Sequence, residues 1–222
     1  MKRSAKRQRR LATHLALIVG CLMTLQAHTS FAQSPSELST EWWQLFLSLP
    51  ASGNPLLDTT GASCVIGQRG RVWFLVGSLG GTVTRTCAIP EATVLYFPLL
   101  NLVDVNLTDQ SASELRREID PCIDATTTLT LEVDGRSLPT KIKRVRSASF
   151  AVTLPNDNLF GLPAGTYSPA VDDGFYVTLS PLDVGQHTIH FKAARGGCPF
   201  LGPDPFEIDV TYNLTVVPVD LR

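Results

Sequence analysis

The chain has 222 residues, of which 44% are hydrophobic and 18% are charged, a composition that supports a folded core and excludes a disordered chain. Six of its 19 basic residues lie in the first ten positions, and without residues 1–32 the chain has 13 Lys and Arg against 20 Asp and Glu, a net charge of −7. This acidic balance argues against nucleic acid as a partner, because phosphate binding depends on Lys and Arg.

The N-terminus has the anatomy of a secretory signal. Residues 2–10 are strongly basic, residues 11–25 are apolar, and Ser30 and Ala32 place small residues at positions −3 and −1 of a cut before residue 33. We expect residues 1–32 to be a signal peptide and the protein to be periplasmic or secreted, with no transmembrane segment after cleavage. An uncleaved membrane anchor is the alternative. The segment that ends in Cys21 also has the form of a lipobox, which would leave the protein lipid-anchored at that cysteine.

Four cysteines follow the predicted cut: Cys64, Cys87, Cys122 and Cys198. An even number of cysteines in an exported chain predicts two disulfides. We favour Cys64–Cys87, because these two residues flank a predicted hairpin, and this choice leaves Cys122–Cys198 as the second pair. The other two pairings stay open. Zinc is disfavoured, because the cysteines lack the close spacing of a zinc site.

The first predicted element is a helix over residues 35–49. Ser34 and Glu37 form a capping box with proline at the first helical position, and apolar residues then recur at helical spacing until Pro50 ends the helix. The apolar stripe includes Trp42. Such a stripe indicates a helix that docks on its own core, and a partner or membrane surface is the alternative.

The pattern then changes to short β-strands. Residues 72–77 and 82–89 flank a short stretch that contains glycines and are predicted to form a hairpin. Residues 93–100 are apolar on both faces, as in a central strand that is covered on both sides, and we place this strand under the N-terminal helix.

A second capping box, at Ser111, predicts a short helix that ends near residue 119. The remaining predicted strands are residues 126–133, 140–146, 149–154, 174–179, 187–193 and 206–217. Short strands with turn signals between them and only two helices predict an all-β fold, an antiparallel β-sandwich of jelly-roll or immunoglobulin-like type. We expect residues 33–222 to form a single domain.

Two stretches carry a resemblance to known proteins. The first is Leu182-x-x-Gly185-x-His187-Thr188-Ile189-x-Phe191, followed by a last strand that ends in Leu214-Thr215-Val216-Val217. It resembles the closing strands of bacterial immunoglobulin-like or jelly-roll modules. The run from Asp58 to Leu75 is similar to a set of uncharacterised exported bacterial proteins. The resemblance implies an exported β-sandwich and implies no activity.

Motifs for catalysis are weak. The sequence Asp58-Thr59-Thr60-Gly61 approaches the aspartic protease turn, but an extra threonine interrupts it and no second copy follows, so a turn held by Asp and Thr side chains is favoured. His187 and His190 are predicted to point to opposite faces of one strand and cannot share a metal there. The sequence has no serine hydrolase elbow.

Oxygen-rich loops suggest calcium, which prefers carboxylate and amide ligands. We expect Asp172 and Asp173 to be the best candidates for metal ligands, ahead of a cluster that includes Asn101 and Asp104. Turn formation is the alternative role for these residues.

A ligand-binding face is predicted from basic and aromatic residues. Lys143 and Arg144 belong to a basic run that favours a charged edge strand and has a patch for acidic glycans as its alternative. The aromatic candidates are Tyr167, Phe175 and Tyr176, with a core role as their alternative.

The leading hypothesis is an exported non-catalytic binding module, with carbohydrate as its first ligand class and a glycan or an envelope protein as its partner. The alternative is a secreted hydrolase or lyase that acts on polysaccharide or ester substrates through carboxylates such as Glu91, Asp104, Glu132 or Asp172. A third hypothesis is a structural envelope protein that docks a partner through the helix containing Trp42 and Trp43.

Overall fold

The computed structural model describes residues 33–219. The predicted signal peptide and Cys21 lie outside these residues. The helix α1 (Pro35–Leu47) begins at the predicted capping box, in which the Ser34 hydroxyl and the Glu37 carboxylate each accept a backbone N–H. It ends two residues before the predicted end, and Trp42 and Phe46 on its apolar stripe are fully buried. The prediction that α1 docks on its own core is therefore confirmed.

Two five-stranded sheets follow. Sheet A has the order β1 (Val72–Phe74), β3 (Val94–Val105), β8 (Gly165–Leu179) and β6 (Ile142–Arg146), with β7 (Phe150–Leu154) also paired to β8. Sheet B has the order β2 (Gly81–Pro90), β10 (Phe206–Val217), β9 (Gly185–Arg195), β4 (Thr126–Val133) and β5 (Arg136–Ser137). Two short 3-10 turns, η1 (Ala51–Gly53) and η2 (Pro139–Lys141), complete the elements together with helix α2 (Ala112–Asp124).

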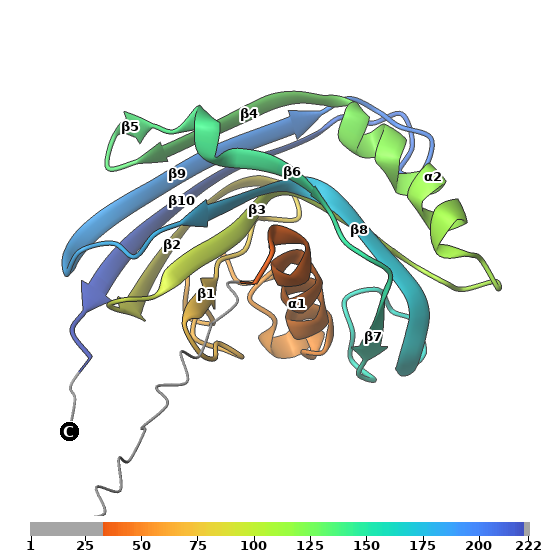
Figure 1. The fold of residues 1–222 in the computed structure, drawn as a ribbon, viewed down its shortest axis with the longest axis horizontal. Helices are drawn as coiled ribbons and strands as arrows, with labels where there is room; N and C mark the ends of the chain where they lie inside the picture. Colours follow the sequence, from red (N-terminus) through yellow and green to blue (C-terminus); the bar gives the residue numbers. More distant parts are fainter. Residues whose placement is uncertain (1–32, 220–222) are drawn as a thin grey trace, which may run out of the picture. The chain divides into compact units, whose positions relative to one another are not determined.

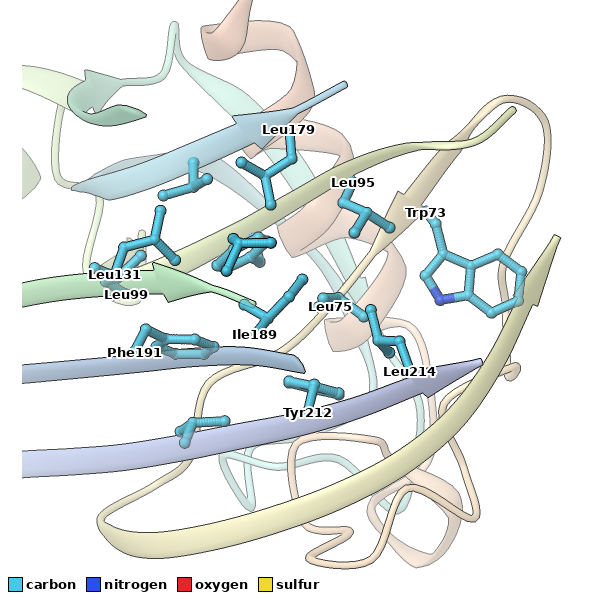
Figure 2. Close-up of a cluster of buried hydrophobic side chains, with 14 of the residues drawn as sticks. Trp73, Leu75, Leu95, Leu99, Leu131, Leu179, Ile189, Phe191, Tyr212 and Leu214 are labelled. Carbon is cyan, nitrogen blue, oxygen red and sulfur yellow. The ribbon is translucent and has the colours of Figure 1, made fainter. Parts of the chain in front are cut away.

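The layers explain why β3 is apolar on both faces. One face of sheet A packs on α1, and the other packs on sheet B through a core that includes Phe97 and Leu99 of β3 and Phe191 of β9. Figure 1 shows sheet A arching over α1, with sheet B on its other side. In Figure 2, Ile189, Phe191 and Tyr212 of sheet B lie close to side chains of sheet A in this core. The predicted central strand under the helix is confirmed.

The structure corrects two predictions on pairing. The fold is mostly β with two packed sheets, but the pairs β1–β3 and β2–β10 are parallel, so the sandwich is mixed rather than antiparallel. The predicted hairpin of residues 72–77 and 82–89 is wrong, because β1 belongs to sheet A and β2 to sheet B. The burial pattern gives the reason: Trp73 and Phe74 of β1 are buried in the cores on opposite sides of sheet A, whereas β2 buries alternate residues only.

Several elements extend beyond their predicted ends. Helix α2 continues to Asp124 through Pro121, because Ile119, Cys122 and Ile123 are buried. Strand β8 begins at Gly165 rather than 174, so it starts nine residues before the predicted strand. The bounds of β10 agree with the prediction.

Both favoured disulfides are present. Cys64 is bonded to Cys87, and Cys122 on α2 is bonded to Cys198 in the loop between β9 and β10. Two disulfides are typical of an oxidising compartment. Among residues 33–219, no helix is long and apolar enough to cross a lipid bilayer.

Candidate functional site

The residues predicted to bind a ligand do not gather on one exposed face. Tyr176 is 1% exposed, and its hydroxyl donates to Asp172 Oδ1 at 2.6 Å. Phe175 packs partly buried against the core between the sheets, and Tyr167 is half-buried, with its hydroxyl donating to the Pro163 carbonyl. Tyr176 therefore has the core role that was the alternative to ligand binding.

The basic run lies on β6, which is an edge strand of sheet A as predicted. Lys143 is exposed. Arg144 donates to the buried carboxylate of Asp173 from Nε and Nη2, and pairs with Asp124 at 2.5 Å. The hydrogen bond with Asp173 holds the pKa of Arg144 above its usual value. Arg146 also contacts Asp173, at 3.3 Å. Arg144 therefore has carboxylate partners inside the protein.

The two predicted metal ligands point to opposite faces of β8. Asp172 faces α1 and accepts from the Trp43 indole at 2.7 Å, whereas Asp173 binds Arg144 and Arg146 of β6. Burial raises the pKa of Asp172 to about 7, although the hydrogen bonds from Tyr176 and Trp43 oppose this. Within residues 33–219, no group of three or more His, Cys, Asp and Glu side chains is placed to hold a metal ion.

The other motifs have local partners. The Asp58 carboxylate accepts the backbone N–H groups of Thr60, Gly61 and Ser63, so this motif is the turn that the sequence favoured. His187 is 2.8 Å from Asp134, whose hydrogen bond raises the pKa of the imidazole. His190 is 2.7 Å from Asp209.

A cleft of about 470 Å³ opens on the described part of the chain and is lined mostly by apolar side chains. One wall comes from α1 and the loop after β7, and contains Trp43, Leu159 and Phe160; the other comes from the loop after β1 and from the β9–β10 connection with the start of β10. Residues of this second wall include Leu79, Phe200, Leu201, Phe206 and Ile208. Exposed apolar side chains at its rim, such as Leu79 at 64% and Phe160 at 43%, remain accessible to a ligand.

Strand β3 runs between the two walls, since every residue from Leu99 to Val105 lines the cleft. Strand β1 pairs only with residues 94–96 of β3, so the outer edge of β3 beyond that point has no strand beside it in the described part of the chain. Asn106 N–H donates to the Pro169 carbonyl, toward β8. Because backbone groups alternate along a strand, those of Asn101 and Val103 point outward into the cleft.

Asp104 is the acidic residue of the cleft. Its Oδ1 accepts the Val105 N–H at 2.8 Å, and its Oδ2 is buried without a hydrogen-bond partner in the described structure. Burial raises the pKa of Asp104 to about 6, and the nearby Glu118 carboxylate on α2 raises it further. Arg195 also lines the cleft, but its guanidinium lies over the Phe206 ring and donates to the Gly196 carbonyl.

Sequence reasoning selected Asp104 only as a calcium or hydrolase candidate and Trp43 only as part of a helix that could dock a partner, and it missed the rest of the cleft walls. Apart from α1 and the start of β10, the wall residues come from three loops that are far apart in the chain. A usable signal was the presence of large apolar residues in loops rich in Gly and Pro, at Leu159-Phe160-Gly161 and Phe200-Leu201-Gly202.

No model of a known protein family matches the chain, and no curated protein matches it either. Among solved structures, the chain is similar to the cysteine protease inhibitor EhICP2 from Entamoeba histolytica, at 15% identity, covering 66% of this chain and 96% of the inhibitor with a TM-score of 0.24. A likeness of this strength carries no argument about fold or function.

Proposed function

We propose that the protein is an exported, non-catalytic binding module and that its cleft holds the ligand. The observation that carries this proposal is a cleft of about 470 Å³ with exposed apolar side chains at its rim. Pockets of this size that combine an apolar lining with a few polar groups are typical of ligand sites, and clustered exposed apolar residues mark interaction surfaces. The two disulfides support an oxidising compartment and therefore export.

An apolar ligand fits the cleft better than a sugar. Sugars are bound by hydrogen-bonding groups around an exposed aromatic face, and Tyr176, one of the aromatic residues predicted for that role, is buried. The aromatic rings of Phe160 and Phe200 at the rim keep carbohydrate as a second ligand class to test. The jelly-roll or immunoglobulin-like topology and the calcium site likewise stay proposals.

The test is titration of the purified protein with the neutral apolar fluorophore N-phenyl-1-naphthylamine. Leu79→Ser and Phe160→Ser each remove an apolar side chain from one wall of the cleft, and we expect each to weaken binding about tenfold. Val184→Ser is the matched control, because Val184 is 51% exposed and lies between β8 and β9, outside the cleft lining. Equal affinity in all four proteins contradicts the proposal. Soluble polysaccharides that compete with the fluorophore indicate a sugar instead.

Asp104 supports a second candidate function, a secreted hydrolase acting on polysaccharide or ester bonds. A carboxyl group with a raised pKa in a cleft is suited to general acid catalysis. Incubation with panels of ester and glycoside substrates tests this function, with Asp104→Asn as the inactive variant. Hydrolysis that survives in Asp104→Asn excludes Asp104 as the acid.

A further inference from the structure

The open edge of β3 indicates what kind of apolar ligand the cleft takes. Edge strands with unpaired backbone groups are sites where another strand adds to a sheet. The outward N–H and C=O groups of Asn101 and Val103 lie in the middle of the cleft, along a segment whose residues from Leu99 to Val105 all line it. A purely hydrocarbon ligand would bury these groups without hydrogen bonds, which costs free energy. A polypeptide strand would pair with them.

The two walls match the two faces of such a strand. Val103 and Val105 belong to the apolar cluster on the α1 side of sheet A, whereas Leu100 and Leu102 belong to the cluster on the sheet B side. The walls follow the same division, since Trp43 packs in the first cluster and Ile208 in the second. Because side chains of a strand alternate between its faces, an added strand would direct successive side chains into opposite walls.

The charge of the cleft indicates which side chain the added strand carries. Asp104 and Glu118 are near each other at one end of the edge, and Asp104 Oδ2 has no hydrogen-bond partner among residues 33–219. The pKa of the Asp104 carboxyl is set by its burial, by the Val105 N–H and by Glu118, and no cation is among these influences. A lysine or arginine from the added strand would complement both carboxylates.

We propose that the cleft binds an extended polypeptide from another protein by strand addition to β3, with apolar side chains in both walls and one basic side chain at Asp104. This inference rests on the proposed function and specifies its ligand. A second copy of this chain fits less well, because residues 94–105 contain no basic residue that could reach Asp104 when two β3 edges pair.

The probe is the acetylated and amidated peptide Ser-Val-Leu-Val-Lys-Val-Leu-Val-Ser, which reads the same in both directions and therefore suits parallel or antiparallel addition. One derivative is N-methylated at the two valines beside the lysine, and another at the two leucines. N-methylation removes the backbone donor and leaves the side chain unchanged. In an added strand, the N–H groups of the two valines and those of the two leucines point to opposite edges, so only one of the two pairs faces β3. We therefore expect one derivative to bind about tenfold more weakly and the other to keep its affinity. Equal affinities of the two derivatives overturn strand addition.

The variant Val103→Pro tests strand addition on the protein side. The Val103 N–H points away from β8, so proline at this position keeps the pairing of β3 with β8 and removes a donor from the outer edge of β3. We expect Val103→Pro to lose the peptide and to keep the far-ultraviolet circular dichroism spectrum of the unsubstituted protein. Exchange of the Asn101 and Val103 amide hydrogens should slow when the peptide binds to the unsubstituted protein.

The outcomes separate the two proposals. If the unsubstituted protein binds the fluorophore but the peptide does not slow exchange of the Asn101 and Val103 amides, strand addition is overturned and the apolar cleft stays in place. If the unsubstituted protein binds neither ligand, the binding cleft itself is overturned. A dimer in sedimentation velocity that Val103→Pro converts to monomer assigns the edge to a second copy and overturns the proposed partner. If a protein without residues 1–32 binds the peptide much more tightly than the full chain, residues 1–32 are the occupant of the cleft, and this result also overturns the proposed partner.

Discussion

The Trp43 indole on α1 donates a hydrogen bond of 2.7 Å to the carboxylate of Asp172, 129 residues away on β8. Both side chains are buried, and the Tyr176 hydroxyl donates to the same carboxylate oxygen. This bond joins the helix to the face of sheet A that the helix covers. It also places an ionisable group where water cannot solvate it, so we expect the docking of α1 to depend on pH.

Stability should fall as pH rises, and Asp172 should cause part of the fall. Burial raises the pKa of Asp172 from its ordinary value of about 4 to about 7, so the folded state holds its proton more tightly than the unfolded state. The stabilisation is complete below pH 4 and is lost as pH rises through 7. Asp172→Asn keeps an oxygen acceptor for Trp43 and Tyr176 and removes this titration.

We therefore expect the melting temperature to drop by several degrees less in Asp172→Asn than in the unsubstituted protein between pH 5 and pH 8. The exposed Asp204 supplies the control Asp204→Asn, which should follow the unsubstituted protein. Parallel melting curves for all three proteins would show that Asp172 has an ordinary pKa.

Arg144→Ala should destabilise the fold, whereas Lys143→Ala on the same strand should not. Asp173 is fully buried and depends on Arg144 and Arg146 for its counter-charge. Breaking a buried ion pair costs about 3–5 kcal/mol, and we expect about 2–3 kcal/mol here because Arg146 remains. Exposed Lys143 should cost less than about 0.5 kcal/mol. Urea unfolding measures both, and equal midpoints would show that Arg144 is dispensable.

The sequence predicted those parts of the fold that depend on local signals. The capping boxes at Ser34 and Ser111 marked both helix starts, and the predicted last strand at residues 206–217 has the bounds of β10. The disulfide Cys64–Cys87 was chosen because of a hairpin that does not exist. The pairing is nevertheless right, because the turn at Asp58 lies against β2 through the bond from Thr86 N–H to the Thr60 carbonyl.

The site was not predictable in the same way. Much of its walls comes from loops near residues 79, 160 and 200, whose apolar residues follow no helical or strand period. The raised pKa of Asp104 depends on burial and on Glu118, and their proximity results from how α2 packs. Tertiary contacts of this kind leave no trace in the spacing of residues along one sequence.

Removing the disulfide Cys122–Cys198 should cost more stability than removing Cys64–Cys87. Their sequence separations are 76 and 23 residues, for which the loop-entropy relation gives about 4.5 and 3.4 kcal/mol. The paired alanine variants, compared in guanidinium unfolding, should differ by about 1 kcal/mol. The first variant should also bind N-phenyl-1-naphthylamine more weakly, because Cys198 anchors the loop that contains Phe200 and Leu201. Unchanged binding would show that this wall holds without its disulfide.

Binding of the lysine peptide should weaken at acidic pH. The pKa of Asp104 is raised to about 6 in the free protein, and a bound ammonium group favours the ionised carboxylate. Affinity should therefore be constant above pH 7 and fall as pH drops through 6, when the carboxylate gains a proton. Glu118 on α2 lies near the same carboxyl group, so the bound cation would pair with both carboxylates.

Calorimetric titration at pH 5 and pH 7.5 measures this change. The control peptide replaces lysine with norleucine, which keeps the apolar stem and removes the charge, so its affinity should change little between the two values. Asp104→Asn keeps an acceptor for the Val105 N–H and should reduce the pH dependence of the lysine peptide. An equal loss of affinity for both peptides at pH 5 would point to a change in the cleft as a whole, and the basic residue would then have no role at Asp104.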